Sequence, residues 1–195
     1  KVLSDPVVRN LGTVGGNIAN ADPVNDEPAA MLAYDAEVVA VGPGGERVIP
    51  ITSFYLDLYQ SALARDEILT EVRIPTPKPG NGGAYLKLER KVGDYAVIGV
   101  GAQLALAQDG TIAAAGLGIC NAGPVSLEPT AAEDFLVGKP AVIDTFNEAA
   151  RLADEASDPI EDDRGPVDYK RAMVRELTRR ALNRAAQRAA QSGGA

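Results

Sequence analysis

The stretch NLGTVGGNIANADPVND, residues 10–26, places two adjacent glycines after a threonine and continues through small residues to a proline and acids. Adjacent glycines let backbone N–H groups converge and approach a ligand closely, because no Cβ stands in the way. The same pair is also typical of a tight turn. The lysine of a P-loop and the G-x-G-x-x-G spacing of a Rossmann motif are both absent. Taken alone, the glycine pair does not distinguish a tight turn from a phosphate-binding loop.

Composition excludes several classes of protein. The chain has 195 residues, one cysteine, no histidine and a formal net charge of −8. It therefore lacks a disulfide framework, the ligands for a Cys/His zinc or iron–sulfur site of its own, and Ser-His-Asp or Cys-His nucleophiles. We expect no metal site, no catalytic residue and a buried Cys120. The acidic charge argues against nucleic acid as a partner, and no apolar run is long enough to predict a membrane span.

Hydrophobic patterning divides the chain at the Pro- and Gly-rich segment TPKPGNGG, residues 76–83. Before it, the patterns predict helices over 27–34, with Asp26 as N-cap, and over 52–62, and strands over 37–41, 47–51 and 67–75. After it, they predict strands over 84–91, 96–108 and 111–120, with Asp109-Gly110 as a hairpin turn. Helices over 129–138, 142–156 and 167–191 complete the chain. This order predicts an α+β fold with domains at 1–77 and 82–190, not a Rossmann alternation.

The whole stretch R-N-x-G-T-x-G-G-N-x-A-x-A-D-P, continuing to Asp26, is more specific than its glycines. It resembles the second FAD-binding motif of molybdenum hydroxylase flavoproteins, the medium subunits of the carbon monoxide dehydrogenase and xanthine dehydrogenase family. EILTEVRIP, GGAYLKLERKVGDYAVIGVG and GICNAGPVSLEPTAAEDFLVGKP resemble later landmarks of that family, in the same order. The resemblance implies the second subdomain of a FAD-binding (vanillyl-alcohol-oxidase/PCMH-type) domain, followed by a C-terminal three-stranded antiparallel sheet with a helical bundle.

The resemblance also implies which residues contact FAD: Thr13, Gly15, Gly16, Asn17, Asn20, Asp22, Asp26, Ile68, Leu69, Lys87 and Tyr95. Ile68 and Leu69 match residues that flank the flavin, and Lys87 with the loop 90–95 matches the segment that approaches the isoalloxazine ring. A cation at Lys87 would stabilise an anionic reduced flavin, and Tyr95 would pack on the ring. A surface lysine and a core-facing tyrosine are the alternatives.

The earlier A-G-G-x-S motif of the family is absent, and the chain does not begin with methionine. We therefore expect an N-terminal portion to be missing and the chain to carry one side of the FAD cleft.

The function implied is that of a cytoplasmic FAD-binding electron-transfer subunit. Its partners would be a molybdopterin-binding large subunit and a small subunit with 2Fe–2S clusters, in a dimer of heterotrimers. Electrons would pass from those clusters through FAD to an external acceptor. A non-catalytic scaffold of such a complex is the alternative. A vanillyl-alcohol-oxidase-type enzyme with its own substrate is a further one, against which the histidine-free C-terminus argues.

Two charged segments offer other sites. The final helix carries Arg171, Arg175, Arg179, Arg180, Arg184 and Arg188. These arginines fit either a docking surface for an acidic partner or a solvated helix face, and we expect the latter. The acidic stretch ADEASDPIEDDRG, residues 153–165, fails the EF-hand spacing, so we expect a solvated loop.

Overall fold

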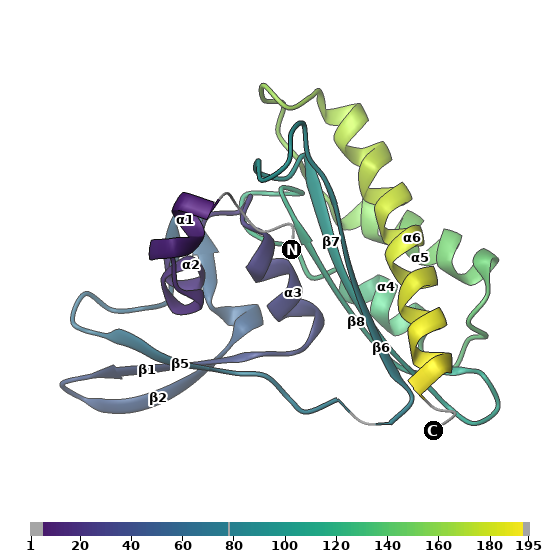
Figure 1. Ribbon diagram of the computed structural model, residues 1–195, viewed down its shortest axis with the longest axis horizontal. Coiled ribbons are helices and arrows are strands. Elements are labelled where there is room, and N and C mark those ends of the chain that lie inside the picture. The colour runs from purple at the N-terminus through teal and green to yellow at the C-terminus, as the bar shows by residue number, and fades with distance from the viewer. Residues whose placement is uncertain (1–5, 78, 193–195) are drawn as a thin grey trace.

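The computed structural model describes residues 6–77 and 79–192, so position 78 of the predicted linker lies outside the described residues. Figure 1 shows a smaller group of N-terminal elements beside a larger layer of one sheet and its helices. The α+β class and the three-stranded antiparallel sheet with helices are confirmed. None of the helices in the described ranges combines the length and apolar character needed to cross a membrane.

The N-terminal elements form two small antiparallel sheets and three short helices. The sheets have the orders β2-β1-β5 and β3-β4. The elements are α1 (Pro6–Leu11), α2 (Val14–Asn20), α3 (Asp26–Ala33), β1 (Glu37–Gly42), β2 (Gly45–Pro50), the 3-10 helix η1 (Ile51–Ser53), β3 (Tyr55–Asp57), β4 (Gln60–Ser61) and β5 (Ile68–Arg73).

The helix predicted over 52–62 is wrong, because this segment forms the end of η1 and the β3–β4 hairpin. Phe54 is fully buried, whereas 56% of Leu58 is exposed, so the apolar positions do not share one buried face. Tyr59 has a φ of 55° at the hairpin turn. A right-handed helix does not contain that left-handed backbone conformation, so the turn excludes a continuous helix here.

The larger layer is built on a meander of three strands in the order β6-β7-β8, as predicted. Its elements are β6 (Asn81–Leu88), β7 (Ile98–Leu106), β8 (Ile112–Cys120), α4 (Thr130–Leu136), α5 (Ile143–Ala156) and α6 (Val167–Ser192). Successive side chains of a strand point to opposite faces. One face buries Ile98, Val100, Leu104, Leu117 and Ile119 against α4, α5 and α6.

The opposite face of this sheet is nearly flat, because glycines recur across it in register. Gly101 pairs with Tyr85 on β6 and with Gly118 on β8, and Gly116 lies two residues away on the same face. A Cβ at Gly118 would lie 2.8 Å from the carbonyl carbon of Ala29 and closer still to its oxygen. The backbone of α3 therefore rests directly on the backbone of the sheet. This contact joins the N-terminal elements to the C-terminal layer (Figure 1).

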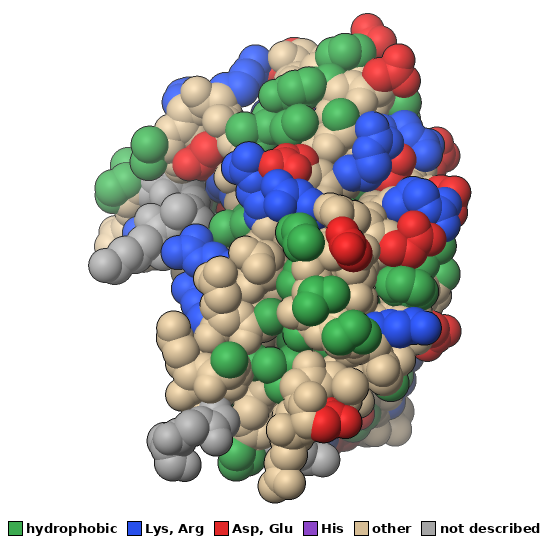
Figure 2. Space-filling view, turned by 90° about the vertical axis from the view of Figure 1, so that its right-hand side faces the viewer, with side chains coloured by type: hydrophobic (Ala, Val, Ile, Leu, Met, Phe, Trp, Pro, Cys, Tyr) green, Lys and Arg blue, Asp and Glu red, His purple; other side chains and the backbone are tan. Residues whose placement is uncertain are grey.

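The α6 helix packs an apolar stripe inward, formed by the buried residues Leu177, Ala181, Ala185 and Ala189. Its charged side is paired largely within the chain. Arginines of α6 contact Asp154, Glu176 and the carbonyl of Gly83. On the face seen in Figure 2, basic side chains alternate with acidic ones. This pairing supports a helix face that neutralises its own charge, not a basic docking stripe.

Glu133 of α4 makes the stability of the fold depend on pH. Its Oε1 accepts a hydrogen bond from the backbone N–H of Leu117 at 2.6 Å. Burial raises its pKa to about 7, against a partial lowering by that hydrogen bond. Between pH 4.5 and 7 the folded state thus holds a proton that the unfolded state has released, so stability falls as pH rises through this range.

We expect Glu133→Gln, which keeps the acceptor oxygen and cannot ionise, to be more stable than the parent at pH 8. The gain should be about 1 kcal/mol after allowance for solvent screening, or about 2–4 °C in Tm. At pH 4.5 the two proteins should unfold at the same temperature. Thermal unfolding by circular dichroism across this pH range checks the result. A difference that does not vary with pH would contradict it.

Candidate functional site

The glycine pair lies in the first turn of α2, not in a tight turn or a left-handed nest. Thr13 is the N-cap, and its hydroxyl accepts a hydrogen bond from Gly16 N at 3.0 Å. Such a cap stabilises a helix by about 1 kcal/mol, which offsets part of the cost of glycine in a helix. A Cβ at Gly15 would lie 3.2 Å from Leu69 of β5. Gly15 therefore allows α2 to pack closely on β5.

The α3 helix begins at Asp26, with Asn25 and not Asp26 as its N-cap. The Asp26 carboxylate is held from the sheet below. It accepts hydrogen bonds from the Tyr85 hydroxyl at 2.6 Å and from Lys87 Nζ at 2.8 Å. Lys87 also contacts Glu89 Oε2 at 3.2 Å and the carbonyl of Asp94 at 2.8 Å. Its side chain is only 2% exposed. Lys87 is therefore an internal cation that orders three segments.

The pKa values of this network follow from its burial. Burial opposes the charge of Lys87, but hydrogen bonds and ion pairs with Asp26 and Glu89 outweigh it and raise the pKa. Burial, with the nearby Cys120 and Asp26, raises the pKa of the Tyr85 hydroxyl. Burial also raises the pKa of the Cys120 thiol to about 12. Cys120 is therefore a neutral buried thiol, as predicted from the sequence.

A cleft of about 910 Å³ opens between α1, one side of α2, the first turn of α3, and the loop between β6 and β7. Its lining includes six of the residues singled out from the sequence: Thr13, Gly16, Asn17, Asn20, Asp26 and Tyr95. The β6–β7 loop contributes Lys91, Val92, Gly93 and Asp94 to the same cleft. Residues from both halves of the chain thus converge on one space.

The remaining predicted residues lie outside this lining. Asp22 is buried, and its Oδ1 accepts a hydrogen bond from Val24 N at 3.1 Å. Ile68 is 70% exposed on β5, and Leu69 packs against the N-terminal core. Gly15 meets Leu69, and Lys87 lies beneath Asp26. Their proposed contacts with FAD stay predictions.

Other residues of the cleft were not predicted from the sequence. Asn25 and Glu27 flank Asp26 and line the same space. Burial, and then the charge of Asp26, raises the pKa of Glu27. Asn17 Oδ1 and Glu27 Oε2 are buried oxygens that have no hydrogen-bond partner among the described residues. Only one feature of the sequence indicates that Asn25 and Glu27 belong to the site, which is that they flank Asp26. The cleft is therefore a polar site with unused hydrogen-bonding capacity.

Family models match nearly the whole chain. Residues 1–77 match the FAD binding domain in molybdopterin dehydrogenase, and residues 83–185 match the CO dehydrogenase flavoprotein C-terminal domain. The chain is 38% identical to the carbon monoxide dehydrogenase medium chain of Hydrogenophaga pseudoflava, over 97% of this chain and 66% of that one. It is 30% identical to subunit alpha of the 6-hydroxypseudooxynicotine dehydrogenase complex of Paenarthrobacter nicotinovorans. This match covers 96% of this chain and 63% of that one.

Solved structures give the same result. The chain is similar to carbon monoxide dehydrogenase from Hydrogenophaga pseudoflava, with a TM-score of 0.93 and 40% identity, over 96% of this chain and 65% of that one. It is also similar to quinoline 2-oxidoreductase from Pseudomonas putida 86, with a TM-score of 0.87 and 31% identity, over 96% and 65%. The chain spans slightly less than two thirds of the length of the relatives that it matches.

Proposed function

Because this chain belongs to the family of FAD-binding flavoprotein subunits of molybdopterin dehydrogenases, we propose that it forms the flavin-binding part of an electron-transfer medium subunit. In this proposal the subunit receives electrons from the iron–sulfur clusters of a small partner and passes them to an external acceptor. Substrate oxidation takes place on a molybdopterin-binding large partner, and the complex is a dimer of heterotrimers in the cytoplasm. The medium-chain names of the relatives support this assignment.

The observation that carries the proposal is the convergence of Thr13, Asn17, Asp26 and Tyr95 on one cleft of about 910 Å³. Its volume is within the range of small-molecule and cofactor sites. Its residues fit a dinucleotide. The buried Asn17 Oδ1 and Glu27 Oε2 have no hydrogen-bond partner in the described part of the chain. Gly16 adds no side chain to this wall of the cleft.

Each residue then has a definable task. Thr13 caps α2 through its hydroxyl, which accepts the Gly16 N–H, and so orders this wall of the cleft. Asp26 is oriented by Tyr85 and Lys87 and forms part of the cleft wall. Tyr95, 49% exposed, presents an aromatic ring. FAD supplies two-electron storage when it is bound. The chain supplies binding, orientation and electrostatics, in keeping with the absence of histidine from its sequence.

A glycine substitution tests this assignment in the full-length protein that contains the chain. Gly16 lines the cleft, and a Cβ there would lie 2.9 Å from Thr13 Oγ1, the oxygen that caps the helix. We expect Gly16→Val to lower the FAD content by at least about tenfold, because the backbone no longer approaches the ligand. The visible absorption of the purified protein, divided by its concentration, measures this content.

Gly44→Val is the matched control. Gly44 lies in the β1–β2 turn, and a Cβ there would meet nothing within 4 Å. This variant should retain the flavin of the parent. The assignment fails if the parent itself carries no flavin. If such a flavin-free parent still co-purifies with its partner subunits, the chain acts as a scaffold of the complex.

A further inference from the structure

The loop over residues 89–97, between β6 and β7, forms one wall of the cleft and has little regular structure of its own. Val92 is 91% exposed at its tip, and Gly93 has a φ of 82°. Just after its tip, the loop is held where Lys87 Nζ donates to the carbonyl of Asp94 at 2.8 Å. The end is held where Asn121 Nδ2 donates to the carbonyls of residues 96 and 97, each at 3.0 Å. Neither contact fixes the ring of Tyr95.

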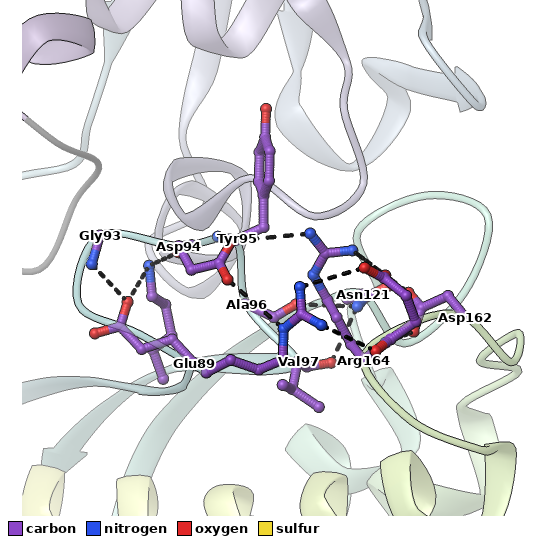
Figure 3. Close-up of polar contacts among 12 residues, drawn as sticks. Glu89, Gly93, Asp94, Tyr95, Ala96, Val97, Asn121, Asp162 and Arg164 are labelled. Atoms are coloured by element: carbon purple, nitrogen blue, oxygen red, sulfur yellow. Dashed lines mark hydrogen bonds and ion pairs between the residues drawn. The ribbon is translucent and has the colours of Figure 1, made fainter.

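A second segment, residues 158–165, reaches that ring from the far end of the sequence. The guanidinium of Arg164 lies over the Tyr95 ring, 5.6 Å from its centroid, and 3.9 Å from Asp94 Oδ1. Arg90 reaches back from the loop to Asp163, with NH2 at 3.2 Å from Oδ2 and NH1 donating to its carbonyl at 3.1 Å. Figure 3 shows Arg164 between Asp162 and the loop, with Tyr95 pointing away from the loop. The acidic loop is thus exposed at Ile160 and Asp163, as expected, but it also contacts the β6–β7 loop.

This segment is in turn anchored in the core. Lys170, in the first turn of α6, is fully buried, and its Nζ contacts Asp162 Oδ2 at 2.8 Å and the carbonyl of Ile160 at 2.9 Å. Burial opposes the charge of Asp162, but Lys170 and the backbone N–H of Arg164 outweigh it and lower the pKa of this carboxyl. Asp162 Oδ1 accepts that N–H at 2.9 Å. A continuous set of contacts thus runs from α6 through Asp162 and Arg164 to Tyr95.

We propose that Arg164 is a positioning residue for Tyr95, and that the segment over residues 158–165 holds the β6–β7 loop in a cofactor-binding position. Exposed ion pairs and a single cation–π contact each add little to stability. Their effect is geometric, because an aromatic wall must be held in place before the ligand binds. The inference rests on the proposed function, and Arg164 reaches the loop through the Tyr95 ring and through Asp94 Oδ1.

A double-mutant cycle in the full-length protein tests this coupling. We expect Arg164→Gln to weaken FAD binding by about tenfold, while Tm changes by less than about 2 °C. In a Tyr95→Leu background, the same change should alter FAD affinity by less than about twofold, because its target is gone. Fluorescence titration of the FAD-free protein measures both affinities. Additive effects of the two substitutions would overturn the proposal.

Arg151→Gln is the matched control. Arg151 of α5 is similarly engaged in ion pairs, with Glu148 at 2.6 Å and with Glu155, but lies on another element. It should leave FAD affinity unchanged. An equal loss of affinity in this variant would show a general charge effect and would overturn the positioning role.

The rate of trypsin cleavage after Arg90 or Lys91 measures how often the loop opens, and this measurement needs no FAD. We expect Arg164→Gln to accelerate this cleavage by about fivefold in the FAD-free protein, since a less restrained loop opens more often. Cleavage at the parental rate would overturn the proposal even if FAD binds normally. If the parent does not bind FAD, the proposed function fails, and the cleavage rate alone decides whether Arg164 holds the loop.

Discussion

Replacement of Lys87 with methionine is expected to lower the free energy of unfolding by about 3–5 kcal/mol, the usual cost of removing one partner from a buried ion pair. The Lys87 side chain is 2% exposed, and its Nζ lies 2.8 Å from Asp26 Oδ2 and 3.2 Å from Glu89 Oε2. Methionine fills a similar volume but leaves the carboxylates of Asp26 and Glu89, largely buried, without their shared cation. For a chain of this length, the loss corresponds to a fall of about 10 °C in Tm.

Thermal unfolding at pH 7 measures this effect. Arg184→Met, which removes a positive charge from an exposed position on α6, serves as the control and should change Tm by less than about 2 °C. FAD affinity should also fall in Lys87→Met, since Lys87 orients the carboxylate of Asp26. A Lys87→Met protein that unfolds within 2 °C of the parent would contradict the internal role of this lysine.

Gly118→Ala is expected to destabilise the protein by about 1–3 kcal/mol or more, because the sheet and α3 leave no room for one methyl group. The added Cβ would lie 2.8 Å from the carbonyl carbon of Ala29 and 2.9 Å from the Cβ of Leu32. Backbone atoms cannot rotate away as a flexible side chain can. The α3 helix must therefore move off the sheet, and Asp26 in its first turn must move with it.

Chemical denaturation measures the first effect and FAD titration the second. Gly123→Ala is a matched control, because a Cβ there would meet only Val125 O, at an ordinary contact distance of 3.6 Å. It should unfold within about 0.5 kcal/mol of the parent. Equal stability of the Gly118→Ala and Gly123→Ala proteins would show that α3 can adjust its position, against the contact described above.

The strands of the C-terminal sheet were predictable because local signals agree with the tertiary structure. The Asp109-Gly110 pair predicted the β7–β8 turn, where Gly110 has a φ of 84° and Asp109 Oδ1 accepts a hydrogen bond from Thr111 N. The helix predicted over 52–62 failed because its apolar residues have helical spacing but do not share a buried face. Of these, Phe54 is buried and Leu58 is exposed.

The candidate site was predictable only in part. The resemblance of the opening stretch to a known motif identified Thr13, Gly16, Asn17 and Asp26, which line the cleft. The inward pairing of Lys87 depends on a register that places it beneath α3, which its local sequence does not reveal. Arg164 contacts Tyr95 across 69 positions of sequence, from a stretch whose acidic composition predicts only solvation.

The glycines beneath α3 also have a dynamic consequence. A joint made of backbone on backbone has no rotamers to exchange, and it forms without loss of side-chain entropy. No change of rotamer can therefore let α3 shift relative to the sheet. The β6–β7 loop, in contrast, is joined to its surroundings through the side chains of Lys87, Asn121 and Arg164, which have rotamers to exchange. We therefore expect changes in the width of the cleft to come from the loop and not from α3.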